Sequence, residues 1–507
     1  MLVCLEARVL SRSSALLFYA LPRRADFASL NSHLRSIFCL CLIGHECIGL
    51  HFFRNYYVKR PINSPGAFVL SPIALRVVEK LTTFVDYKMS EVGGQKCLFP
   101  TLGRSQLWAR SGRWEKFGNE IFRLKDRIGR SLCLQPTHEE EACEFVSRLD
   151  LGKSVLPLRI YQISSKFRDE IKPKLGLLRC REFLMKDMYT FDLDVEAAEK
   201  TYDAVSNTYS EIFRALRLPV FKVAAEGGLM GDCLSHEFQC PLPVGEDTLS
   251  VCPNCNKAVL AKNAGTVPLR TQQTLLDSWM CPDCGSDGQA FSSVELAHCF
   301  LLGDKYTSDF NVRTTTQDGI KILQMGCYGI GMTRLLATAL EHFTTSLARE
   351  NPPTELRWPL GFAPYSGAIA LQKDNAKDAL SGDELNRVLA RFMELPSLSI
   401  SPSDSTFFAG LLPHGDILVD DRPHLSLGRK LLDLRRLGVP WILIAKGVKG
   451  SVNAEYELVD VNRGGISFTA SLDDVAAAFT CSNFQTSLPC INDGQCSRLW
   501  HRSDASG

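Results

Sequence analysis

One stretch of the sequence decides the fold class that we expect: Phe167-Arg-Asp-Glu-Ile-Lys-Pro-Lys-Leu-Gly-Leu-Leu-Arg-Cys-Arg-Glu-Phe183. Strand-like runs lie on both sides of a loop that contains Pro173 and Gly176, which predicts a hairpin of two β-strands. The wider segment from Lys153 to Met188 has nine basic residues against four acidic ones, a surplus of five positive charges. Guanidinium groups bind phosphate as a fork, and Phe183 offers a face on which a base can stack. A site for a phosphate-bearing ligand and an exposed charged hairpin are the two interpretations of these residues.

The composition sets outer limits on what the chain can be. Its 507 residues predict two to four domains. Hydrophobic residues make up 45% and charged residues 22%, which excludes a wholly disordered chain and a collagen-like one. The net charge is +1, so a polyanionic partner would have to bind through a local basic patch, such as the one at the hairpin. The 19 cysteines are spread along the chain, which favours a reducing compartment with one metal site over a disulfide scaffold.

Residues 1–60 differ from the rest of the chain. They contain eight Arg or Lys residues and three acidic ones, a bias that is typical of a mitochondrial presequence. We therefore expect the protein in the mitochondrial matrix; an N-terminus without a targeting role is the alternative. The apolar run at 37–53 contains His45, Glu46 and His51 and is shorter than a bilayer requires, so we expect no membrane anchor.

Periodicity predicts a helix over residues 65–95, with Gly93 and Gly94 at its end. Its apolar face consists of Ile73, Val77, Leu81, Phe84 and Val85. Residues 97–137 alternate short apolar runs with turn residues, which predicts antiparallel strands. A second helix is expected over 190–216, with the apolar stripe Ala197, Tyr202, Val205, Tyr209, Ile212 and Phe213.

The C-terminal half has a different pattern. Residues 293–345 contain strand-like runs and then a helix, and Asn351-Pro-Pro353 is the clearest linker. Beyond it, residues 360–480 alternate strands with helical stretches, which predicts an α/β domain. The expected strands are Gly367–Leu371, Asp416–Val419 and Trp441–Ile444.

Four cysteines lie in a small polar insert at residues 240–292. Cys252-Pro-Asn-Cys255 and Cys281-Pro-Asp-Cys284 form two C-x2-C pairs that are 25 residues apart. This spacing predicts a tetrahedral zinc site of the ribbon type, in which four thiolates leave no open coordination position. Cysteines without a metal are the alternative.

Two further segments carry groups that can hold a ligand. Gly326-Cys-Tyr-Gly-Ile-Gly-Met-Thr-Arg334 places three glycines before an arginine that opens a helix, so a ligand can approach the backbone closely. Tight packing of a strand on a helix is the alternative. Pro136-Thr-His-Glu-Glu140 groups a hydroxyl with two carboxylates, which can hold an ammonium group or a metal. By themselves these residues favour the other interpretation, a helix N-cap with acidic residues in the first turn.

Together, and in this order, the segments resemble those of the prolyl-tRNA synthetases, a family of class II aminoacyl-tRNA synthetases, and within it the mitochondrial enzymes of animals. The resemblance runs from about Ser64 to about Ala478. Class II motif 1 is similar to the helix at 70–94 and the strand that ends at Phe99-Pro100, followed by Leu107-Trp108 and Ser111-Gly-Arg-Trp114. Motif 2 is similar to residues 167–187. Motif 3 is similar to residues 326–334. Pro136–Glu140 resembles the family's substrate loop, and Ser235–Gln239, Asp420-Asp-Arg422 and Leu437–Pro440 match as well.

The resemblance implies an α+β fold, with an antiparallel sheet of six or seven strands flanked by helices. It implies a presequence over 1–60, a catalytic domain over 61–350 with the zinc-ribbon-like insert, and an α/β anticodon-binding domain over 356–480. Residues 481–507 lie beyond the family's end and are expected to be disordered. Motif 1 forms the dimer interface in this class, so a homodimer is expected.

The resemblance also implies an activity, the ATP-dependent ligation of L-proline to tRNA(Pro) through a prolyl-adenylate, for mitochondrial translation. ATP and Mg²⁺ are then required. Bacterial relatives carry a large editing domain where this chain has only residues 239–297, so editing in cis is not expected. A non-catalytic tRNA-binding relative and a different specificity, such as threonine, are the alternatives.

The family's functional residues map onto matching positions of this chain. Arg168 is expected to bind the α-phosphate of ATP and the proline carboxylate. The other ATP contacts are Glu170 to the adenine amino group, Phe183 stacked on adenine, and Arg179 and Arg334 at the γ-phosphate end. The proline imino group is expected at Thr137 and Glu139, with His298 along the pocket, and the region of anticodon reading includes Asp421, Arg422 and Lys430.

Overall fold

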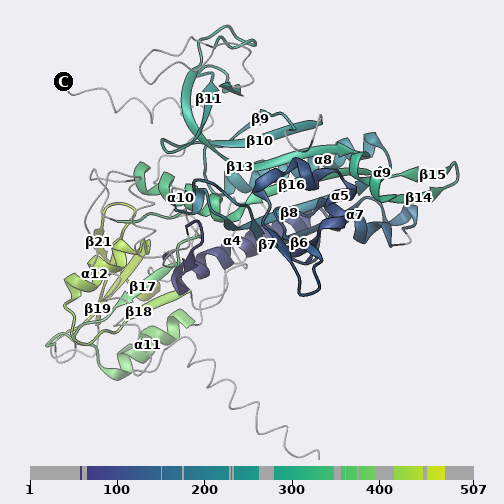
Figure 1. Cartoon of the computed structure of the whole chain (residues 1–507). Coiled ribbons are helices and arrows are strands. Elements are labelled where there is room, and N and C mark those ends of the chain that lie inside the picture. The colour runs from purple at the N-terminus through teal and green to yellow at the C-terminus, as the bar shows by residue number, and fades with distance from the viewer. Residues whose placement is uncertain are drawn as a thin grey trace, which may run out of the picture. The chain divides into compact units, whose positions relative to one another are not determined.

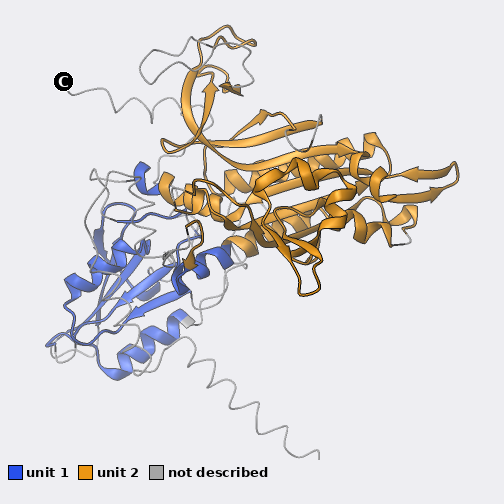
Figure 2. Cartoon of the chain, in the orientation of Figure 1, with its two compact units in different colours: residues 1–59, 70–80, 343–486 blue, residues 60–69, 81–342, 487–507 orange. Residues whose placement is uncertain are grey.

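The computed structural model describes residues 58–59, 65–149, 151–173, 176–227, 230, 233–261, 279–347, 355–359, 361–373, 376–393, 416–448, 454–473 and 475. The predicted presequence, apart from Val58–Lys59, lies outside the described residues, as do the 351–353 linker and the tail at 481–507. The chain divides into two compact units (Figure 2). Unit 1 includes residues 70–80 and 343–486, and unit 2 includes residues 81–342.

The described part of unit 2 is built on a nine-stranded sheet (Figure 1). Its order is β12 (Ala258–Leu260), β11 (Asp247–Val251), β13 (Gln289–Gly303), β16 (Gln324–Gly331), β8 (Glu182–Asp192), β7 (Leu158–Phe167) and β3 (Gln95–Lys96), with β10 (Leu234–Pro241) paired to β13 and β9 (Phe221–Ala224) paired to β10. Within this sheet β3 and β7 are parallel, and the other pairs are antiparallel. The expected six or seven strands correspond to the sheet without β11 and β12, which the Cys-rich insert adds.

The hairpin that the sequence predicted is present. β7 and β8 pair along their whole length, from Leu158 opposite Phe191 to Phe167 opposite Glu182. β16, which carries the three glycines of motif 3, pairs with the other edge of β8. Motifs 2 and 3 therefore lie on adjacent strands, although more than 130 residues separate them in the sequence.

Helix α4 (Pro72–Glu91) is shorter than the predicted helix over 65–95. It begins at Pro72, after Ser71, whose hydroxyl accepts a hydrogen bond from the amide of Ala74 (3.2 Å). It ends as predicted, because Gly93 takes a left-handed φ of 70° and the amide of Gly94 bonds to the carbonyl of Met89. Four of the five predicted face residues are buried, Val77, Leu81, Phe84 and Val85.

Helix α8 (Val195–Ala215) starts five residues later than predicted, because Thr190–Asp192 are the end of β8. Asp194 caps it by accepting a hydrogen bond from the amide of Ala197 (2.9 Å). The predicted stripe is buried from Tyr202 to Phe213, while Ala198 is buried in place of Ala197.

The segment at 97–137 forms a small antiparallel sheet, as predicted, in the order β4 (Leu102–Arg104), β6 (Ser131–Leu134) and β5 (Arg123–Lys125). Two short helices inside this segment were not predicted, α5 (Ser105–Arg110) and α6 (Arg113–Lys116). The remaining described elements of unit 2 are η2 (Gly118–Glu120), α7 (Glu139–Ser147), η3 (Lys153–Val155), η4 (Gly176–Leu178), α9 (Lys305–Phe310), the hairpin β14 (Arg313–Thr316) and β15 (Gly319–Ile322), and α10 (Met332–Ser346), which continues into unit 1. β1 (Val58–Lys59) and β2 (Val69–Leu70) form a separate two-stranded sheet.

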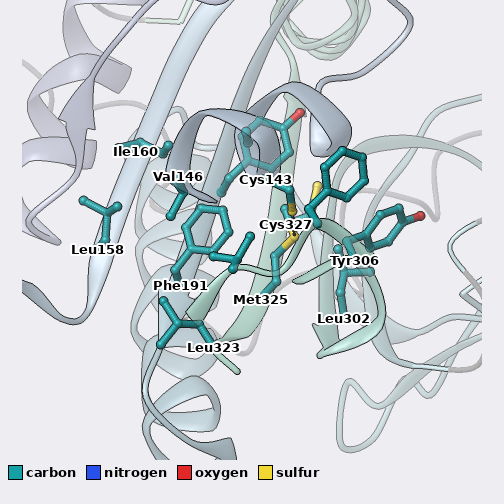
Figure 3. Packing of buried hydrophobic residues seen from close by; sticks show 14 of the residues in the cluster. Cys143, Val146, Leu158, Ile160, Phe191, Leu302, Tyr306, Leu323, Met325 and Cys327 are labelled. Carbon is teal, nitrogen blue, oxygen red and sulfur yellow. Dashed lines mark hydrogen bonds between the residues drawn. The ribbon is translucent and has the colours of Figure 1, made fainter. Parts of the chain in front are cut away.

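The largest described core cluster of unit 2 contains side chains of α7 and of the sheet (Figure 3). Cys143 and Val146 of α7 pack with side chains from three neighbouring strands, Leu158 and Ile160 of β7, Phe191 of β8, and Met325 and Cys327 of β16. Full burial of an aliphatic or aromatic side chain stabilises the fold by roughly 1.5–3 kcal/mol, so this cluster holds α7 against the strands of motifs 2 and 3.

Unit 1 has the predicted α/β pattern. Its sheet has the order β18 (Ile417–Asp420), β17 (Gly367–Ala370), β19 (Trp441–Gly447), β20 (Ala454–Asp460) and β21 (Ile466–Thr469), and its described helices include α11 (Gly382–Met393) and α12 (Leu427–Arg436). β17 pairs in parallel with β18 and β19, and the last two strands add antiparallel pairs. Among the described residues, none of the helices has the length and apolar character needed to cross a bilayer.

A glycine after α12 offers a test of how unit 1 packs. Gly438 has a left-handed φ of 73°, and a Cβ atom there would lie 2.7 Å from Cδ1 of Trp358. We expect Gly438→Ala to lower the free energy of unfolding by about 2 kcal/mol or more, because both the backbone and the tryptophan must yield. Urea unfolding of the full chain measures this. The matched control is Gly428→Ala in α12, where nothing lies within 4 Å and the free energy of unfolding should stay equal or rise; equal losses in both variants would contradict the expectation.

Candidate active site

Arg168 directly follows the first strand of the hairpin and lies against its second strand. Its amide donates to the carbonyl of Arg181 (2.9 Å), and its guanidinium carbon lies 5.4 Å from the centre of the Phe183 ring. Burial and the charge of Arg334 lower the pKa of Arg168. Nε of Arg168 is buried and has no hydrogen-bond partner among the residues that the structure describes. This cation is thus poised for an anionic ligand above an aromatic ring.

Arg334 opens α10 and faces the same region. Its Nε donates to the carbonyl of Leu178 (3.0 Å), and one terminal nitrogen donates to the carbonyl of Glu295 (2.9 Å) and lies 3.6 Å from the Glu295 carboxylate. The structure therefore brings Arg168, Phe183 and Arg334 together, as the motif assignments imply.

Glu295 and His298, both on β13, complete this end of the site. Nδ1 of His298 lies 2.9 Å from Glu295, and its Nε2 lies 2.6 Å from the Ser235 hydroxyl. Burial acts to raise the pKa of Glu295, but His298 and the two arginines outweigh it and lower this pKa to about 2. Glu295 was not predicted as a site residue; its position three residues before His298 was the available signal. The carboxylates of Glu295 and Glu237 and the His298 ring lie within 4.8 Å of one another, close enough to share a cation.

Glu170 and Arg179 pair with each other. Nε of Arg179 donates to Glu170 (2.8 Å), and another of its nitrogens donates to Glu246 (2.5 Å). Glu246 belongs to the connection between β10 and β11, at the base of the Cys-rich insert. The end of the site that was expected to hold adenine and the γ-phosphate is therefore lined by groups from both motif 2 and the insert.

The loop before α7 places Thr137 and Glu139 together. The Thr137 hydroxyl lies 2.8 Å from both carboxylate oxygens of Glu139, and Cys327 of motif 3 lies 3.1 Å from the same carboxylate. Acidic residues do occupy the first turn of α7, but the N-cap residue is His138, and it makes no side-chain capping bond. The Thr137 hydroxyl is thus directed toward the carboxylate rather than the helix amides, an arrangement that suits recognition of an ammonium group.

Arg113 is the residue of this pocket that the sequence analysis did not single out. It is buried and donates to Glu139 (2.9 Å) and to Glu140 (3.1 Å). Its guanidinium lies over the Trp108 ring, 4.9 Å from the centre, and two further rings are within 6 Å. Burial acts to raise the pKa of Glu139, but Arg113 outweighs it, so this pKa is lowered and Glu139 stays ionised. The signal was available in Ser111-Gly-Arg-Trp114, which matches the family.

A buried ion pair, Lys166 and Asp187, supports the same loop through contacts to His138. Nζ of Lys166 lies 2.9 Å from Asp187 and 2.8 Å from Nδ1 of His138. Tyr189 donates to Asp187 (2.7 Å) and accepts from the amide of His138 (2.8 Å). Burial and the charge of Lys166 lower the pKa of His138 to about 4, so its ring is neutral and can accept from Lys166. Polar residues at alternate positions of β7, Gln162, Ser164 and Lys166, are all buried and were the sequence signal for this network.

The predicted anticodon residues lie in unit 1, on and beside α12. Asp421 is exposed. Arg422 is buried and donates to Asp420 (2.6 Å) and Asp433 (2.8 Å), and Nζ of Lys430, also buried, donates to the carbonyl of Leu371 (2.7 Å). The structure thus places Asp421 at the surface and gives Arg422 and Lys430 partners inside the unit.

The four cysteines of the insert lie together. The sulfur of Cys252 is 3.3 Å from that of Cys284, and the sulfur of Cys255 is 3.5 Å from that of Cys281 and 3.7 Å from that of Cys284. In a tetrahedron with Zn–S bonds of about 2.3 Å, sulfur atoms are about 3.8 Å apart. The cluster therefore fits a zinc ion.

The chain is similar to known proteins of one family. The family model described as tRNA synthetase class II core domain (G, H, P, S and T) matches residues 122–343. A probable mitochondrial proline–tRNA ligase of Rattus norvegicus is 40% identical over 408 residues, which are 80% of this chain and 79% of the relative. The chain belongs to the proline–tRNA ligase family. A further member, the probable mitochondrial proline–tRNA ligase of Schizosaccharomyces pombe, is 34% identical over 380 residues, 75% of this chain and 81% of the relative.

Solved structures of the proline–tRNA ligase family share the fold. Giardia lamblia prolyl-tRNA synthetase, in complex with prolyl-adenylate, aligns with a TM-score of 0.60 at 18% identity and covers 84% of this chain and 74% of that chain. The enzyme of Cryptosporidium parvum, complexed with L-proline and AMP, aligns with a TM-score of 0.59 at 16% identity over 83% and 71%. The predicted class II fold is confirmed.

The buried ion pair should be essential for stability in this member of the proline–tRNA ligase family. We expect Asp187→Asn to lower the free energy of unfolding by about 3–5 kcal/mol, because Lys166 would remain buried without its counter-ion. Urea unfolding measures the loss. The control is Glu196→Gln, which removes the partner of Lys200 on the exposed face of α8 and should cost less than about 0.5 kcal/mol. A small loss in Asp187→Asn would show that Lys166 is uncharged or finds another partner.

Proposed function

We propose that the protein ligates L-proline to tRNA(Pro) at the expense of ATP, through a prolyl-adenylate, in the mitochondrial matrix. The observation that carries this is the position of Arg168, which lies on Phe183 beside Arg334, in the same unit as the Thr137–Glu139 pair. One end of this arrangement suits a nucleoside triphosphate and the other an ammonium group. A non-catalytic tRNA-binding role is not favoured, because the charged groups that adenylation needs are all present.

In the first step, the proline carboxylate attacks the α-phosphorus of ATP; the new O–P bond forms as the bond to pyrophosphate breaks. Both reactants are anions, so the barrier is lowered by cations placed where negative charge accumulates. Arg168 is assigned to the α-phosphate and the proline carboxylate, and Thr137 and Glu139 to the secondary ammonium. In the second step, the 3′-terminal ribose hydroxyl of tRNA attacks the acyl carbon and AMP leaves. Neither step needs a protein nucleophile.

At the nucleotide end, Phe183 is assigned to the adenine face and Glu170 to its amino group. Arg179 and Arg334 are assigned to the γ-phosphate end. Glu170 already receives a hydrogen bond from Arg179, so ATP binding exchanges this contact for one to the base. His298 contacts Glu295 (2.9 Å) and is assigned to the proline pocket.

Mg²⁺ fits beside the arginines. Carboxylate oxygens are the ligands that this ion prefers, and Glu295 and Glu237 offer them close together. His298, a poorer ligand for Mg²⁺, would orient Glu295 through the 2.9 Å contact. When bound with ATP, the ion would neutralise phosphate charge and help to fix the in-line geometry.

Further features of the proposal concern the domains and assembly. We assign residues 61–350 to catalysis and 356–480 to anticodon binding, where exposed Asp421 is the direct contact and Arg422 and Lys430 shape the loop. We assign 1–60 to a presequence and 481–507 to a tail. The homodimer is proposed through motif 1. The insert at 240–292 takes the place of an editing domain, and its described residues include the short strands β11 and β12, so we propose that mischarged tRNA is not edited in cis.

The adenylation step can be tested by ATP–pyrophosphate exchange with the full chain. We expect exchange to be strongest with proline, compared with threonine, alanine and cysteine. Arg168→Ala should lower it about 100-fold or more, because transition-state charge loses its main partner. Arg127→Ala, an exposed arginine in the turn between β5 and β6, should leave it unchanged. Full exchange by folded Arg168→Ala protein would contradict the assignment, and no exchange with any amino acid would favour the non-catalytic alternative.

We also propose that the four cysteines hold a structural zinc ion. Metal analysis of the purified chain should find about one zinc ion per chain, and Cys252→Ser should lose most of it. The control is Cys97→Ser, which changes a partly buried cysteine outside the cluster and should keep the metal. Zinc-free wild-type protein, or unchanged zinc in Cys252→Ser, would refute this site.

A further inference from the structure

The proline pocket contains two carboxylates for one guanidinium. Arg113 is 3% exposed, Glu139 is 1% exposed and Glu140 is fully buried. One terminal nitrogen of Arg113 lies 2.9 Å from Glu139 and 3.1 Å from Glu140. Its Nε is buried and has no hydrogen-bond partner among the described residues. With both carboxylates ionised, this buried group would carry one surplus negative charge.

The groups that face Glu140 do not remove this surplus. They are Arg113 of α6, the Ser111 hydroxyl, Cys133 of β6, Tyr306 of α9, and Glu139, Glu141 and Cys143 of α7 itself. The two thiols and the phenol are neutral, since burial raises the pKa of each.

Two further cations act on Glu139 from a greater distance, Lys166 and Arg168. Lys166 has its own carboxylate, Asp187, at 2.9 Å. Arg168 faces Glu295 and is assigned to the phosphate and carboxylate of the reactants. Neither is therefore a dedicated counter-ion for Glu140.

A buried, uncompensated carboxylate is costly, and such a group commonly retains a proton instead. Burial and the charge of Glu139 raise the pKa of Glu140, although Arg113 acts against them. The hydroxyl of Ser111, which is only half-buried, lies 2.6 Å from Glu140 and offers a route by which a proton can reach solvent.

We propose that Glu140 holds a proton in the proline-free enzyme and releases it when the secondary ammonium of proline binds beside Glu139. The inference rests on the proposed function of this pocket. The O–H bond of the Glu140 carboxyl breaks, the electron pair stays on the carboxylate, and the proton passes to the buffer. The ammonium group supplies the positive charge that the proton supplied before. An uncharged analogue of proline cannot do this, so the exchange contributes to specificity.

Calorimetric titration of the full chain with proline tests this directly. At pH 7, in phosphate, HEPES and Tris buffers, the observed heat should vary with the ionisation enthalpy of the buffer, with a slope equivalent to the release of roughly half a proton or more. Because a proton is released on binding, affinity should rise with pH. We expect the Kd for proline to fall about threefold or more from pH 6.5 to 7.5.

Glu140→Gln imitates the protonated carboxyl permanently. We expect it to bind proline with heats that do not depend on the buffer and with a Kd that does not change with pH. The matched control is Glu144→Gln, one turn further along α7, where the carboxylate pairs with Arg148, Arg104 and Arg110; it should behave as the wild type. Ser111→Ala, which removes a hydrogen bond that favours ionised Glu140, should move the rise in affinity to higher pH.

The outcomes separate this inference from the proposed function. Buffer-independent heats in the wild type, or undiminished release in Glu140→Gln, would overturn the inference while proline binding stands. A chain that binds no proline would instead overturn the proposed function. If Glu140→Gln does not fold, the buffer series on the wild type and the shift in Ser111→Ala still decide.

Discussion

The ion pair of Lys166 and Asp187 is the interaction on which the rest of unit 2 depends. The two residues lie on adjacent antiparallel strands, β7 and β8, and both are buried. Separating them inside the sheet would leave a bare charge, a cost of several kcal/mol. The pairing register of the hairpin is thereby held, because a slip of one residue between the two strands would put the Lys166 and Asp187 side chains on opposite faces of the sheet. Register in turn sets where Arg168 emerges, two residues beyond Lys166.

The same ion pair also positions the substrate loop, Pro136–Glu140, through contacts to His138. Asp187 fixes Tyr189, whose hydroxyl accepts the His138 amide, and Lys166 bonds directly to the His138 ring. The residues on either side of His138 are Thr137 and Glu139. A polar network inside the core therefore positions both groups that are assigned to the imino nitrogen, and each of its residues has at least one hydrogen-bond or ion-pair partner.

The sequence predicted the frame of this structure well and its interior charges poorly. Apolar periodicity located α4, α8 and the strands of unit 1, and turn residues located the β7–β8 hairpin, since both signals are local. The family motifs named Arg168, Phe183 and Arg334, which the structure brings together. The sequence did not predict the buried roles of Arg113, Glu295 and the Lys166 network. A charged residue is expected to be exposed unless its partner from another segment of the chain is known. Arg422 and Lys430 have their charges directed toward partners within unit 1, and their part in anticodon reading stays a prediction.

The Cys-rich insert is part of the site's framework rather than an appendage. β11 pairs with the first five residues of β13, and the same strand continues to Glu295 and His298. Gly245, just before β11, passes so close to Ser293 of β13 that an added Cβ would lie 2.1 Å from its carbonyl oxygen. The next residue, Glu246, accepts a hydrogen bond from Arg179, at the end of the site that is assigned to the nucleotide. A shift of β13 at Ser293 would therefore also move the backbone at Gly245. The position of the insert and the position of Glu295 thus depend on the same strand, β13.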